Sequence, residues 1–123
     1  MSDLTLTGVS HLELYVSDLD ASTSWYESAV GLLPRPNQPA QVLVLQPSNA
    51  SFRLVLRPGR PSDAHGDFGH VALSVDSLEA LEAWAEHLDE IGVQHKGVKQ
   101  GPAGYTIDLV DPDGHDIELT YET

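Results

Sequence analysis

The feature that most constrains the fold of this chain is an internal repeat, because the sequence matches itself at a shift of 59 residues. The shift aligns GVSHLELYVSDLDASTSWYES with DFGHVALSVDSLEALEAWAEH. The only two tryptophans pair with each other, Trp25 with Trp84, and His11 pairs with His70. Such rare residue types seldom align by chance, so the repeat predicts two copies of one supersecondary unit.

Each copy has the pattern of a strand, a helix and further strands. Residues 11–16 alternate between polar and apolar, as a strand with two different faces does. Helical stripes follow and run to Gly31 and Gly92, with Ser17 and Asp76 predicted as their capping residues. Trp25 and Trp84 are expected to pack in the core. Further strands are expected over 32–36, 41–46 and 51–57 in the first copy, and over 93–98, 105–110 and 116–121 in the second.

The expected organisation is a single domain, since 123 residues is an ordinary size for one. Module one is predicted over about 5–58, a linker rich in proline and glycine over about 58–67, and module two over about 68–123. The sequence Asp111-Pro112-Asp113-Gly114 predicts a tight turn, which joins the last two strands into a hairpin.

Composition limits the possible partners and location. The formal net charge is −13, and only six residues are lysine or arginine. Nucleic acid and membrane surfaces attract clustered positive charge, so neither is an expected partner. The first residues lack the pattern of a secretory signal, and cytoplasmic residence is the default expectation. Without cysteine, neither disulfides nor thiolate metal ligands need consideration.

Three residues carry the chemical prediction, namely His11, His70 and Glu118. The two histidines hold the same position in the two copies, and Glu118 lies on the polar face of the last predicted strand. Two imidazoles and one carboxylate suit one divalent metal ion, whether iron, manganese, zinc, nickel or cobalt. The alternative is that the histidines are half-buried strand residues and Glu118 is simply exposed.

The chain resembles the vicinal oxygen chelate superfamily, which includes glyoxalase I, extradiol dioxygenases, methylmalonyl-CoA epimerase, fosfomycin-resistance enzymes and bleomycin-resistance proteins. The resemblance covers nearly the whole chain and is carried by GVSHLELYVSDLDASTSWYESAVGL, FGHVALSVDSLEALEAWAEHLDEIGV and YTIDLVDPDGHDIELTYE. It implies an α+β fold of two tandem βαβββ modules, whose curved mixed sheets surround a metal-binding groove. His11, His70 and Glu118 fall on three of the family's ligand positions.

The sequence departs from the best-known branches at the positions that decide their chemistry. The phase of apolar residues places Arg53 opposite Glu118, where glyoxalases and epimerases carry a fourth ligand. Asp108 stands where the dioxygenase and fosfomycin branches carry a tyrosine, and Glu13 where fosfomycin enzymes tend to carry a hydroxyl residue. We therefore predict a site with three protein ligands and open positions.

Four other residues are candidates for the pocket. Glu13 and Asp108 are predicted catalytic groups, because a strand carboxylate beside the metal can act as a general base. Arg53 is predicted to bind an anionic substrate group, and His95 to contact substrate. The alternative for each of these four residues is that it is an ordinary surface residue with no role in the site.

Two functions from different classes remain open. The first is a metal-dependent enzyme, of isomerase, lyase, transferase or dioxygenase type, whose ion takes two vicinal oxygens of a small substrate. The second is a non-catalytic small-molecule or antibiotic-binding protein of the bleomycin-resistance type. The resemblance also implies a homodimer, in which one site can draw on both subunits.

Overall fold

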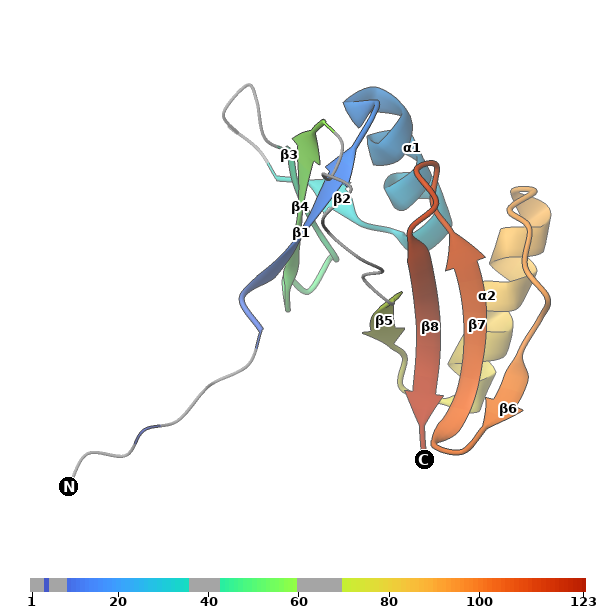
Figure 1. Cartoon of the computed structure of the whole chain (residues 1–123). Coiled ribbons are helices and arrows are strands. Elements are labelled where there is room, and N and C mark those ends of the chain that lie inside the picture. The colour runs from blue at the N-terminus through green and yellow to red at the C-terminus, as the bar shows by residue number, and fades with distance from the viewer. Residues whose placement is uncertain (1–3, 5–8, 36–42, 60–69) are drawn as a thin grey trace.

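Two four-stranded sheets, each carrying one helix, make up the computed structural model, which describes residues 4, 9–35, 43–59 and 70–123 (Figure 1). Module one contains β1 (His11–Val16), α1 (Leu19–Val30), β2 (Leu33–Pro34), β3 (Leu43–Gln46) and β4 (Arg53–Pro58). Module two contains β5 (His70–Ser74), α2 (Leu78–Glu90), β6 (Lys99–Gly101), β7 (Gly104–Val110) and β8 (Asp116–Glu122). From residue 60 on, the predicted linker lies outside the described residues.

The two sheets have the same topology, as the repeat requires. Their strand orders are β1-β4-β3-β2 and β5-β8-β7-β6. In each, the first strand pairs in parallel with the last, and the other pairings are antiparallel. The predicted α+β fold with mixed sheets is therefore confirmed. No helix among the described residues is long and apolar enough to cross a membrane.

Strand alternation divides each sheet into a helix-covered face and an open face. Leu14 and Val16 of β1 are buried, whereas the alternate residues His11, Glu13 and Tyr15 are exposed. On β8 and β7 the buried apolar side chains are Ile117, Leu119, Ile107 and Leu109. The core thus lies between each sheet and its helix, and the polar residues of the repeat lie on the other face.

Both helices begin one residue later than the sequence predicted. The Asp18 carboxylate accepts the Ala21 N–H, and the Ser77 hydroxyl accepts the Ala80 N–H. The prediction of Ser17 and Asp76 as caps was therefore wrong, because the neighbouring polar residue is the one that reaches the free N–H groups. Gly31 ends α1 in the left-handed conformation at φ +69°, as predicted.

The strand predicted over 93–98 is absent, and β6 is a three-residue strand that begins at Lys99. Two contacts hold the 93–98 segment away from the sheet. The ring of His95 bonds to Asp89 of α2 through Nε2, and the Gly97 N–H donates to its Nδ1. Gly97 takes φ +83°, a left-handed conformation that interrupts an extended strand.

The modules contact each other through their helices and through the turn between β7 and β8, which lies beside α1 (Figure 1). Asp111 in this turn is buried and accepts hydrogen bonds from the Tyr26 hydroxyl and from His115. Asp113 accepts the N–H of Ser17 and the hydroxyl of Ser22. The second module's hairpin is therefore anchored on the first module's helix.

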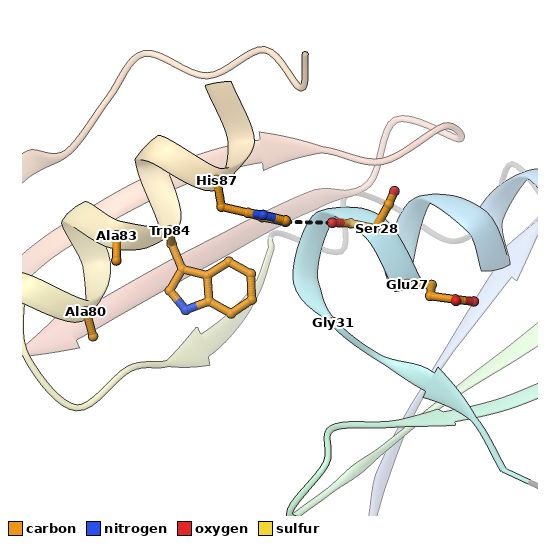
Figure 2. A pocket seen from close by; sticks show the side chains of 7 residues that line it. All are labelled: Glu27, Ser28, Gly31, Ala80, Ala83, Trp84 and His87. Carbon is orange, nitrogen blue, oxygen red and sulfur yellow. Dashed lines mark hydrogen bonds between the residues drawn. The ribbon is translucent and has the colours of Figure 1, made fainter. Parts of the chain in front are cut away.

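A groove of about 450 Å³ runs between the two helices, where the Trp84 indole faces the end of α1 (Figure 2). His87 donates through Nε2 to the Ser28 carbonyl at 2.7 Å. Ser28 and His87 are equivalent positions of the repeat. An approximate twofold axis that relates the two modules therefore passes between them. Trp25 and Trp84 are half-buried at the edge of the core rather than central to it.

Candidate metal centre

Module two brings two of the three predicted ligands together. Glu118 of β8 is level with Ala72 of β5, two residues along from His70. Their side chains meet on the open face of the sheet, with His70 Nε2 3.6 Å from Glu118 Oε2. Both groups line a cavity of about 260 Å³. An imidazole nitrogen and a carboxylate oxygen at this separation fit two positions on one divalent ion.

Asp108 lies beside this pair, since it faces Glu118 directly across the β7–β8 ladder. Its carboxylate accepts a hydrogen bond from the Lys99 ammonium of β6. That carboxylate raises the pKa of Lys99, with a smaller contribution from Glu118. The face of module two is therefore acidic, with Lys99 as the positive charge that reaches its cavity.

His11, the third predicted ligand, lies on the open face of module one. It is exposed on β1, with Nδ1 3.0 Å from the Ser10 hydroxyl oxygen. Among the described residues, no three histidine or acidic side chains of one chain form a cluster able to hold a metal ion. The structure thus unites His70 with Glu118 but does not bring His11 to them within the chain.

The strand register corrects the predicted counterpart of Glu118 in module one. Glu118 pairs with Ala72, whose repeat equivalent is Glu13, and Glu13 pairs with Val55. The fourth position is therefore Val55, and Arg53 is instead the counterpart of Asp116. The sequence prediction aligned the apolar residues of the two last strands and was wrong by two positions. Alternation repeats every two residues, so it determines which sheet face a residue lies on but not its register. A fourth protein ligand is still absent, since a valine side chain cannot bind a metal.

The face of module one carries the opposite charge. Arg53 is level with His11, and Arg57, four residues further along β4, lies on the same face. Glu13 forms an ion pair with Arg57. Both arginines are exposed, and they are two of only six basic residues in the chain. This face is therefore cationic where that of module two is anionic.

His95, which the sequence predicted to contact substrate, lies in a different environment from the His70–Glu118 cavity. Its side chain is 6% exposed, and both ring nitrogens are occupied by Asp89 and the Gly97 N–H. It lies beyond β7 from the His70–Glu118 cavity, whose lining does not include it.

Sequence reasoning missed Arg57 and Lys99. Arg57 had a usable signal, because its spacing from Arg53 places both on one strand face. Lys99 had none, since the strand before it was predicted in the wrong place.

The comparisons with known proteins agree with this fold. The model of the Glyoxalase/Bleomycin resistance protein/Dioxygenase superfamily matches residues 8–119. An uncharacterized protein of Pseudomonas aeruginosa is 30% identical, over 92% of this chain and 87% of its own length. The metallothiol transferase FosB of Bacillus licheniformis is 28% identical, over 97% of this chain and 78% of its own.

Among solved structures, the antibiotic-binding protein TnmS3 of Streptomyces superposes with a TM-score of 0.80 at 27% identity. The match covers 98% of this chain and 100% of TnmS3. Together with the repeated topology and the position of the DPDG turn, these findings establish that the chain belongs to the glyoxalase/bleomycin resistance protein/dioxygenase superfamily.

Proposed function

We propose that this protein is a divalent-metal-dependent enzyme that acts on a small molecule through two vicinal oxygens. The observation that carries the proposal is the His70–Glu118 pair, which meets in a polar cavity on an open sheet face. A bound ion would supply Lewis acidity and stabilise negative charge on the substrate oxygens. The likeness to FosB, a metallothiol transferase, supports an enzyme of this class.

His11 completes the ligand set, and the complete site requires a second copy of the chain. Among the described residues of one chain, the hydrogen bonds between the modules run through the helices and the Asp111 turn. The cationic face of module one and the anionic face of module two are complementary, so in a homodimer each can cover the other. Each dimer would then hold two sites.

The remaining charged residues of the two faces bind substrate and move protons. Asp108 is the proposed general base of module two, because it is next to Glu118 and its charge is balanced by Lys99. Glu13 is a second candidate base, held in place by Arg57. Arg53, level with His11, binds an anionic group of the substrate.

The test is complementation between two defective variants. His11→Ala and His70→Ala are each expected to bind Mn²⁺ at least about 100-fold more weakly in calorimetry, since a lost ligand costs no less than a lost outer-shell partner. When the two variants are unfolded and refolded together, mixed dimers should regain one tight site per dimer. Glu79→Gln, on the exposed face of α2, is the control and should bind normally.

Two results would contradict the proposal. If neither variant changes Mn²⁺ affinity, the assigned ligands are wrong. If the variants lose binding but the mixture regains none, the site is not shared between subunits.

A second candidate function is the sequestration of a small molecule without turnover. The specific observation in its favour is the likeness to TnmS3, an antibiotic-binding protein. Elemental analysis of the purified protein separates the two. Near-stoichiometric metal that disappears in Glu118→Ala supports the enzyme, whereas metal-free protein that still binds ligand supports sequestration.

A further inference from the structure

Another cavity borders β7; it shares Asp108 with the His70–Glu118 cavity, but neither His70 nor Glu118 lines it. It has a volume of about 1070 Å³ and forms because the 93–98 segment does not pair with the sheet. β7 pairs with β6 only over residues 104–106, so 107–110 have a partner strand only in β8. Trp25 of α1 also lines the cleft.

The walls of this cleft are fixed by hydrogen bonds. His95 ties the segment to α2 through Asp89, as described above. The Tyr26 hydroxyl donates to Asp111 at 2.6 Å, which fixes α1 beside the end of β7. Trp25 packs edge-to-face on the Tyr26 ring, with ring centroids 4.9 Å apart. The cleft is therefore present before any ligand binds.

Its lining combines apolar surface with charged side chains. Trp25 and Val93 are half-buried, and Val110 is 58% exposed although it is apolar. Two carboxylates also line the cleft, but Asp89 is bonded to His95 and Asp108 to Lys99.

Lys96 is the remaining charged group of the lining. Within the part of the chain that the structure describes, its ammonium forms no hydrogen bond or ion pair. Lys96 is therefore the lining group that is free to pair with an anionic ligand.

We propose that this cleft binds a planar aromatic anion, with its ring against Trp25 and Val110 and its carboxylate or sulfonate at Lys96. Stacking on an indole and an ion pair with an ammonium are the contacts that such a ligand needs. The volume slightly exceeds the range of roughly 300–1,000 Å³ of typical small-molecule sites. The site contains neither His70 nor Glu118, so it does not depend on the metal.

The repeat supplies an internal comparison. Trp84, the equivalent of Trp25, lines the interhelical groove of Figure 2. There the lining includes Glu27, whose carboxylate has no ion-pair partner among the described residues. An unpaired carboxylate repels an anion, so the Trp84 groove should not bind the same ligand.

Nuclear magnetic resonance tests the proposal directly, because the chain has only two indole N–H groups. Trp25→Phe and Trp84→Phe assign the two signals. Titration of the wild-type protein with 2-naphthoate, in the presence of a chelator, should shift the Trp25 signal saturably and leave the Trp84 signal in place. Lys96→Gln should weaken 2-naphthoate binding about threefold to fivefold, which is the scale of one exposed ion pair.

Uncharged 2-naphthamide is the matched probe, and its affinity should not change in Lys96→Gln. The proposal is overturned if 2-naphthoate shifts neither signal, if it shifts both alike, or if Lys96→Gln binds it as the wild type does. Because the chelator removes metal, none of these outcomes bears on the His70–Glu118 site.

Discussion

The open faces of the two modules differ although their folds match. Module two places Glu118 beside His70, whereas module one places Val55 at the equivalent position beside His11. Module one has Arg53 and Arg57 on its face, whereas module two has Asp116 and Thr120 at the equivalent positions. The difference teaches that the repeat preserves the scaffold and the histidine, while the last strand of each module sets what its face can bind.

The modules also differ in how their hairpins are held. The turn between β7 and β8 is anchored on α1 through Asp111 and Asp113. In the turn between β3 and β4, the side-chain bond that the structure shows is local, from the Ser51 N–H to Asn49. The position of Glu118 therefore depends on contacts with the other module.

The largest effect is expected from Asp111→Ala. Asp111 is 4% exposed and accepts four hydrogen bonds, from the Tyr26 hydroxyl, the Asp113 N–H and two groups of His115. Removing a buried charge from its partners typically costs about 3–5 kcal/mol. Urea unfolding should show a loss of this size. Asp113→Ala is the control, because Asp113 is exposed and should cost about 1 kcal/mol.

If Asp111→Ala and Asp113→Ala cost the same, the anchoring of the second hairpin does not depend on burial.

The second prediction concerns a substitution that removes a difference between the two open faces. Val55→Glu places a carboxylate at the position equivalent to Glu118. If the two faces meet in a dimer around one metal ion, the new carboxylate should tighten Mn²⁺ binding about tenfold in calorimetry, or about 1.4 kcal/mol.

Val44→Glu is the matched control, because Val44 is level with Val55 on the neighbouring strand and adds the same charge. Equal effects of the two variants would mean that the charge, and not a ligand position, changes the affinity.

The sequence predicted the topology and the faces because these follow from periodicity. The alternation of His11, Glu13 and Tyr15 with apolar residues is a local property of one strand, and burial bears it out. The register between β1 and β4 is not local, since alternation is satisfied equally by shifts of two residues. Val55 was therefore missed, and Arg53 was placed opposite Glu118.

Segment 93–98 shows a second limit of the sequence. Its composition favours a strand, but the bonds from His95 to Asp89 and to the Gly97 N–H override that preference. Similarly, nothing in the spacing of Trp25 and Trp84 predicts that one indole lies near a free ammonium and the other near a free carboxylate. These features depend on which segments meet in space.

The third prediction concerns the stability of the module contact at alkaline pH. Burial, and then the hydrogen bond to Asp111, raises the pKa of Tyr26 far above its ordinary value. Since the folded state favours the neutral phenol, this contribution is complete below pH 10 and is lost as the pH rises. Above about pH 10 the wild type should lose up to about 1.4 kcal/mol per pH unit relative to Tyr26→Phe.

Urea unfolding of both proteins between pH 8 and 11.5 measures this difference. Tyr26→Phe should be the less stable at pH 8, because it lacks the hydroxyl that Asp111 accepts. A difference that stays constant up to pH 11.5 would contradict the assigned role of Tyr26.

The smallest effect is expected at the approximate twofold axis, where Ser28 and His87 meet. The two residues are equivalent in sequence, yet only His87 reaches across, donating to the Ser28 carbonyl in the last turn of α1. His87→Ala should therefore cost about 1 kcal/mol in urea unfolding, the value of one hydrogen bond. Ser28→Ala keeps the carbonyl and should cost less. If it costs more, the serine hydroxyl and its bond to the Ser24 carbonyl stabilise this contact instead of the histidine.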